Sequence, residues 1–192
     1  MAIQHDSITD PNIHEPKGIS TASNGAMYFA DGAGSGDWKR GAGHAYADMD
    51  ITNGTTAFAL AAASAFTKLN PTAEWQSGES HELTITPANG EITLTVAGTY
   101  LIEFWVTFDT ASLAAGTKYY FKYAIDGVTA TRQLSVQKNT AGVDRIGAAA
   151  HGIVTVSANQ VLSIYTAGDG TSSGTNITVA DAGLTALLLK ET

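Results

Sequence analysis

The clearest pattern in the chain is a strict alternation of apolar and polar side chains across residues 98–109. Large apolar residues occupy every second position: Tyr100, Ile102, Phe104, Val106 and Phe108. Period-two alternation over this length, rich in aromatic and β-branched types, predicts a strand with one face in a core. The opposite face is mixed, and its Leu101 and Trp105 require cover from another surface.

Shorter segments with the same period follow through the rest of the chain. The pattern predicts further strands at residues 82–86, 91–96, 118–126, 131–137, 147–157, 160–166 and 183–190. Asn89-Gly90 separates the first two and is typical of a hairpin turn. Residues 55–66 favour two short strands, with a helix as the alternative because Ala and Leu are good helix formers. Many short strands separated by turns predict an all-β, antiparallel jelly-roll sandwich over residues 44–192.

The first 43 residues lack such a period. Pro11 and Pro16 hold the residues before them in extended conformations. Residues 30–37 are too rich in glycine for the interior of a strand or helix. The few large apolar side chains are scattered, so this segment cannot build a core of its own. We therefore predict an extended N-terminal arm over residues 1–43 that becomes ordered on another molecule.

Some predicted strands are apolar on both faces, as in residues 153–154 and 187–189. A strand of this kind is buried on both sides. A two-sheet sandwich covers only one face of each sheet, so the second face requires another subunit. The residues predicted for this self-association interface are Trp105, Ile153, Leu187, Leu188 and Leu189.

Composition narrows the classes of function. The 10 basic and 18 acidic residues give a net charge of −8, which argues against a protein that neutralises nucleic-acid phosphates. The absence of cysteine excludes disulfides and thiolate zinc sites. Apolar runs are far shorter than the roughly 20 residues that span a bilayer, and the start shows no secretory signal pattern. We expect a chain made in the cytoplasm, with no membrane insertion and no nucleic-acid partner.

Candidate catalytic and metal-binding patterns are weak. The glycines of residues 32–36 lack the Gly-Lys-Ser/Thr and the following helix that a phosphate loop needs. The five histidines share no ligand spacing: His5, His14, His44, His81 and His151. No Gly-x-Ser-x-Gly motif is present. We therefore predict a non-enzyme with no catalytic residues, no cofactor and no metal. Residues 168–174 are interpreted as a plain loop, with Ca²⁺ or sugar binding as the alternative, and Tyr120 is a candidate glycan contact.

Residues from about 80 to 192 resemble the C1q/TNF-like jelly-roll family. The resemblance lies in Ala97-Gly98-Thr99-Tyr100-Leu101-Ile102, in YYFKYAIDG at 119–127, in GIVTV at 152–156 and in GLTALLL at 183–189. The family forms compact homotrimers around an apolar axis. The resemblance therefore implies a homotrimer, as the two-faced strands require independently.

Residues 8–21 resemble the start of tailed-bacteriophage head decoration or head-fibre proteins. This resemblance implies a virion protein on the capsid surface, anchored to the major capsid protein through Pro11, Asn12, Ile13, His14, Glu15, Pro16 and Lys17. The alternative function is the receptor- or glycan-binding tip of a phage tail fibre, with a host surface glycan as partner.

Overall fold

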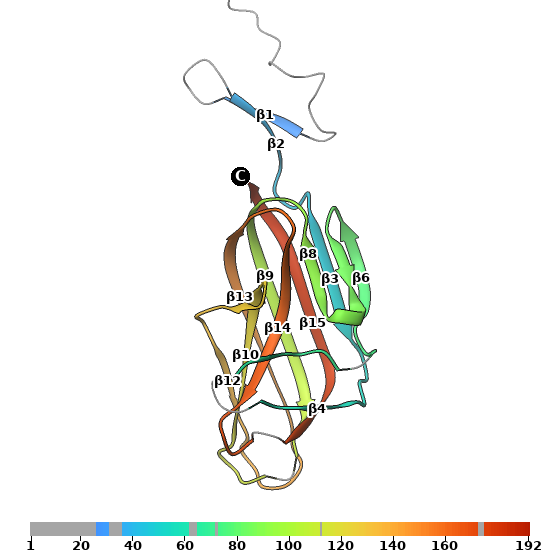
Figure 1. Cartoon of the computed structure of the whole chain (residues 1–192), viewed down its shortest axis with the longest axis vertical. Helices are drawn as coiled ribbons and strands as arrows, with labels where there is room; N and C mark the ends of the chain where they lie inside the picture. The colour runs from blue at the N-terminus through green and yellow to red at the C-terminus, as the bar shows by residue number, and fades with distance from the viewer. Residues whose placement is uncertain (1–25, 31–35, 62–64, 72, 112, 173–174) are drawn as a thin grey trace, which may run out of the picture. The chain divides into compact units, whose positions relative to one another are not determined.

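The chain is all-β and divides into two compact units after Gly41 (Figure 1). The computed structural model describes residues 26–30, 36–61, 65–71, 73–111, 113–172 and 175–192. Within these residues there is no α-helix, and so no helix long and apolar enough to cross a membrane. The predicted docking residues Pro11–Lys17 lie outside the described part of the chain.

The first unit contains a hairpin that the sequence pattern did not predict. Strand β1 (Ala26–Ala30) pairs antiparallel with β2 (Gly36–Arg40). Tyr28 lies opposite Trp38, and their rings meet edge to face with centroids 5.5 Å apart. Aromatic cross-strand pairs stabilise a ladder. The hairpin is an addition to the extended arm predicted for residues 1–43, which itself stays a prediction.

The second unit is a sandwich of two antiparallel sheets. The seven-stranded sheet has the order β11 (Val128–Thr129), β10 (Lys118–Ile125), β14 (Gln160–Gly168), β8 (Glu91–Leu94) and β7 (Thr84–Thr86), with β12 (Leu134–Gln137) on β10 and β5 (Thr67–Lys68) on β14. The six-stranded sheet has the order β13 (Arg145–Val156), β9 (Gly98–Asp109), β15 (Asn176–Glu191), β3 (Tyr46–Ile51) and β6 (Gln76–His81), with β4 (Ala57–Ala59) on β15.

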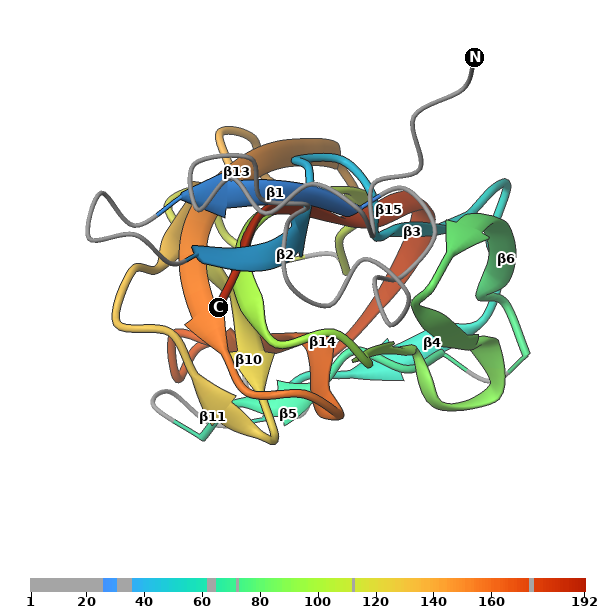
Figure 2. The same cartoon turned by 90° about the horizontal axis from the view of Figure 1, so that it is seen from above.

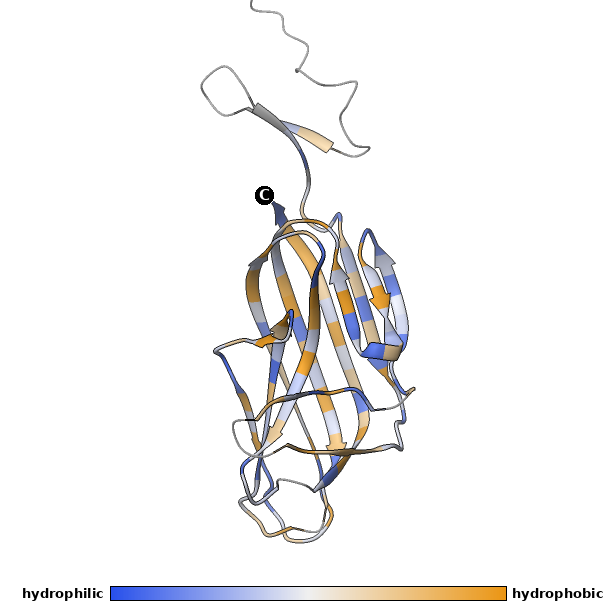
Figure 3. Cartoon of the chain, viewed as in Figure 1, coloured by the Kyte–Doolittle hydropathy of each residue, from blue (hydrophilic) through white to orange (hydrophobic). Residues whose placement is uncertain are grey.

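The core lies between the two sheets and confirms the alternation found in residues 98–109. All five predicted inward residues of β9 are at most 3% exposed. Phe108 packs against Tyr119 and Phe121 of the opposite sheet, with ring centroids 5.1 and 5.3 Å apart. Figure 3 shows apolar and polar residues alternating along the long strands, and Figure 2 shows the sandwich from above.

Two local predictions can be compared with the structure. The predicted hairpin around Asn89-Gly90 is present, with the 3-10 turn η3 (Pro87–Asn89) joining β7 to β8 and Gly90 left-handed at φ 65°. In residues 55–66, β4 confirms one short strand. The second short strand, β5, starts just beyond this segment at Thr67.

Candidate self-association surface

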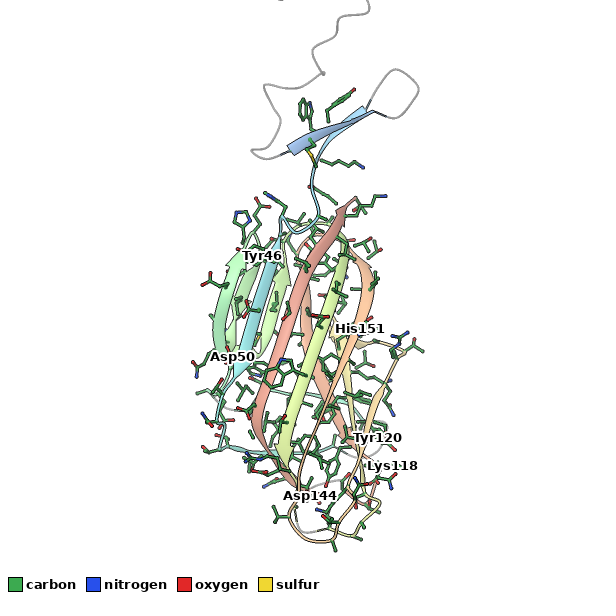
Figure 4. The ribbon with its side chains drawn as sticks, turned by 180° about the vertical axis from the view of Figure 1, so that it is seen from behind. Tyr46, Asp50, Lys118, Tyr120, Asp144 and His151 are labelled. Carbon is green, nitrogen blue, oxygen red and sulfur yellow. The ribbon has the colours of Figure 1, made fainter. Side chains whose placement is uncertain are left out.

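A row of apolar side chains crosses the outer face of the six-stranded sheet. Strand register places Ile153 opposite Leu101, Leu101 opposite Leu187, and Leu187 opposite Tyr46. Ile153 is 66% exposed and Tyr46 is 38% exposed, while Leu101 and Leu187 are half-buried. With strands 4.7–4.9 Å apart, the row is roughly 14 Å long. Figure 4 looks onto this face, with Tyr46 at the upper end of β3. We call these four residues the apolar row.

Trp105 adds a second apolar feature to the same face. It lies between Ala149 of β13 and Gly183 of β15. A Cβ atom built on Gly183 would fall 2.3 Å from the Trp105 Nε1, so the indole lies directly over the glycine backbone. Because Gly183 has no side chain, the indole can pack directly on the strand, and Trp105 is still 44% exposed. A large aromatic residue that is rigidly seated and still exposed is a typical interface anchor.

Polar residues separate Trp105 from the apolar row. His151 lies opposite Glu103, which lies opposite Thr185, which lies opposite Asp48. His151 and Glu103 are both exposed. An interface on this face would therefore combine apolar contact with a line of groups that can hydrogen-bond.

The far end of the face is closed by an ion pair. Arg145 donates from Nε and Nη2 to the two carboxylate oxygens of Asp109, each at 2.7 Å. The hydrogen bonds from the Arg145 guanidinium lower the pKa of Asp109 from its ordinary value. The bidentate geometry orders both side chains. This end of the sheet thus presents a neutralised pair rather than an apolar surface.

The structure places four of the five predicted interface residues on the outer face or surface and one in the core. Trp105, Ile153 and Leu189 are exposed on the surface, and Leu187 is half-buried on the outer face. Leu188 is fully buried in the core of its own chain, so its placement at the interface is wrong. The reason is ordinary strand alternation, which turns Leu188 inward with Leu184 and Ala186 and turns Leu187 outward. The register irregularity between Leu188 and Lys190 then leaves Leu189 outside the ladder with β9.

Tyr46 was missed by the sequence analysis. Its strand pairs with β15, which lies about 140 positions later in the chain, as in the pair Tyr46 and Leu187. The alternation of Ala47, Met49 and Ile51, each at most 1% exposed, is the signal that marks Tyr46 as outward-facing. The sequence analysis predicts that Leu101 needs cover from another surface. In the structure its own chain leaves Leu101 half-buried.

The loop after β14 is stabilised by its own carboxylate. Asp169 Oδ1 accepts hydrogen bonds from Thr171 and from the Ser172 amide, and Oδ2 accepts one from the Lys118 amide at 2.7 Å. Burial raises the pKa of Asp169, but these hydrogen bonds outweigh it and lower the pKa to about 2. Both oxygens thus serve the loop itself, which supports the plain-loop interpretation. Tyr120, the candidate glycan contact, is half-buried opposite Ser135 and Ala167.

The two antiparallel sheets place the chain in a structural class: it has a jelly-roll fold similar to that of C1q globular domains. The solved globular domain of the zebrafish complement 1qA protein is similar to 77% of this chain and 99% of its own length, with a TM-score of 0.50. Sequence identity is 9%, so the likeness concerns the fold. No protein-family model matches this sequence, and no curated protein does either.

Proposed function

We propose that this chain is a structural virion protein: a homotrimeric capsid decoration, cement or head-fibre protein anchored by its N-terminal arm. The observation that carries the proposal is the apolar row with Trp105 beside it. Exposed large apolar side chains gathered on one sheet face, here Ile153, Trp105 and Tyr46, favour a protein interaction site. The proposed protein is non-enzymatic and binds by surface contact alone.

The composition of the chain favours copies of itself as the occupant of this face. The chain carries only 15% charged residues, fewer than a surface kept free in solution usually has. Closed cyclic symmetry is the common solution for homo-oligomers. The C1q/TNF-like resemblance implies three-fold rather than two-fold symmetry. The apolar row would then lie near the three-fold axis, with the polar row around it.

The arm supplies the attachment. Residues 8–21 carry the resemblance to tailed-phage head proteins, and the major capsid protein is the proposed partner. A segment that is ordered only on docking binds weakly by itself, because ordering costs conformational entropy. Three arms held by one trimer raise the effective concentration of the second and third, so the assembly dissociates slowly.

Light scattering on the purified full chain tests the trimer. We expect a mass of about 60 kDa for a C3 trimer, three times the chain mass of 19.9 kDa. Ile153→Asp should reduce it to a single chain, because association would bury an unpaired carboxylate. Val128→Asp is the matched control, since Val128 is 75% exposed but lies on β11 of the other sheet. A wild-type chain that stays single at high concentration, or an Ile153→Asp variant that stays assembled, would contradict the interface.

Sedimentation with stripped tailed-phage capsids tests the anchor. In the described part of the chain the core residues all lie between Ala45 and Leu188, so the fragment 42–192 retains this core. We expect the full chain to sediment with capsids and the fragment to stay in the supernatant. A full chain with residues 11–17 scrambled is the matched control and should also stay in solution. Equal sedimentation of all three would place the anchor elsewhere. Binding of fragment 42–192 to host glycans would instead favour the fibre-tip function.

A further inference from the structure

Two histidines and a glutamate meet at one end of the six-stranded sheet. His44 precedes β3, His81 is the last residue of β6, and Glu82 follows it. The pairing of Tyr46 with His81 brings these distant segments together. The His44 Nε2 and Glu82 Oε1 atoms are 3.1 Å apart, and one ligand atom from each of the three residues lies within 4.8 Å of the others.

The His81 ring is fixed in a ligand-like orientation. Its Nδ1 lies 2.7 Å from the backbone oxygen of His44. Because a carbonyl oxygen only accepts, the contact requires a proton on Nδ1, and in the neutral ring Nε2 then has the lone pair that a metal needs. Tyr46 stacks on the ring from one side, with centroids 6.0 Å apart and planes at 23°, and the His44 ring meets it edge-on at 5.1 Å. A backbone carbonyl bound to the far ring nitrogen is the usual support for a metal-binding histidine.

Glu82 is also held by the fold around it. Its backbone is left-handed, with φ 57°, a region that residues other than glycine rarely adopt. The Thr95 hydroxyl donates to its carbonyl oxygen, and the following Leu83 is 6% exposed in the core. These two anchors fix the backbone that points the carboxylate toward His44, with which it forms the 3.1 Å contact.

We propose that His44, His81 and Glu82 form a binding site for a divalent transition metal of the zinc type. Two imidazole nitrogens and one carboxylate oxygen are a ligand set that Zn²⁺ uses when its fourth position is open. At metal–ligand distances of about 2.0–2.1 Å, two ligands of a tetrahedral ion lie about 3.3 Å apart, close to the separation of His44 and Glu82. Because His81 and Glu82 are exposed, water takes the fourth position. The proposal does not rest on the proposed function, although Tyr46 of the apolar row stacks on His81.

Sequence spacing could not reveal this site. His44 and His81 are 37 positions apart, and only the β3–β6 pairing makes them neighbours. The prediction of no metal ligands rested on short-range spacing, which detects sites within one helix or loop.

Calorimetric titration of the chelator-treated full chain with ZnCl₂ tests the proposal. The chain has five histidines, so the assignment depends on variants. We expect His81→Gln and Glu82→Gln each to weaken zinc binding at least about tenfold. The matched control is His151→Gln, an exposed histidine on β13 of the same sheet, which should leave the affinity unchanged. Metal-free thermal melts of all variants verify the fold.

A spectroscopic measurement gives a second readout. Co²⁺ in place of Zn²⁺ should produce the strong visible absorption of a tetrahedral ion in the wild-type chain and in His151→Gln. The band should be absent from His81→Gln. The proposal is overturned if zinc binding is undetectable, or if it survives both substitutions as well as it survives His151→Gln. In that case the 3.1 Å contact between His44 and Glu82 serves only the fold.

Discussion

Truncating Leu188 separates a core role from an interface role most sharply. The side chain is fully buried, and its Cδ1 lies against Gly98, where an added Cβ would be only 2.5 Å away. Tyr100, the cross-strand partner, is held in place by a hydrogen bond from its hydroxyl to the Val96 carbonyl at 2.8 Å. These neighbours are fixed, so Leu188→Ala should leave a cavity that cannot collapse. We expect a loss of about 3–5 kcal/mol in the free energy of unfolding.

Urea unfolding measures this loss. A domain of this size has a total stability of about 5–15 kcal/mol, so the substitution should remove a large part of it. With a slope of about 2 kcal/mol per molar urea, the midpoint should fall by roughly 2 M. The fluorescence of Trp75, which is 4% exposed, reports the transition. Val128→Ala is the matched control, because Val128 is 75% exposed and its truncation should change stability by about 0.5 kcal/mol or less. If Leu188→Ala lost no more than this control and only lowered the assembled mass, the core placement would be refuted.

Two further predictions follow from the outer face and the loop. Gly183→Ala should displace the Trp105 indole, because the new methyl group would lie only 2.3 Å from the indole Nε1. The displacement should shift the tryptophan emission and weaken self-association. Unchanged values of both would show that the ring does not lie over Gly183. Asp169→Ala should cost roughly 1–3 kcal/mol by removing the acceptor for Thr171 and Lys118. Since the pKa of Asp169 is lowered to about 2, its ionised carboxylate stabilises the fold above about pH 4 and loses this effect as the pH falls toward 2. Thermal melts across this range should therefore converge between wild type and variant, and a constant difference would contradict the assignment.

Local alternation was sufficient to predict the central strand and the fold class. In β9 the side-chain period, the residue types and the length all favour the same structure, and every predicted inward residue is buried. When these local signals agree, a strand can be predicted from the sequence alone. The outward Trp105 was also predictable, because a tryptophan on the polar face of such a strand breaks the pattern.

The errors arose where distant pairing or irregular register decides the outcome. Leu188 was misplaced because three consecutive leucines hide the alternation that turns Leu188 inward with Leu184 and Ala186, while the register shift that follows leaves Leu189 unpaired with β9. The proximity of His44 and His81 depends on the pairing of β3 with β6, which no local window contains. The β1–β2 hairpin combines a favourable aromatic pair, Tyr28 and Trp38, with flanking glycines that disfavour strands, and the pair prevails.

The position of β15 in the six-stranded sheet has a consequence for biosynthesis. This strand lies between β9 and β3 and pairs with both, although it comes after every other strand in the chain. Until β15 has been synthesised, the β13–β9 pair and the β3–β6 pair have no strand that links them into one sheet. Contacts between such distant segments also make closure of the sheet slow. The outer face is therefore completed only after β15 has been synthesised and has paired with both β9 and β3.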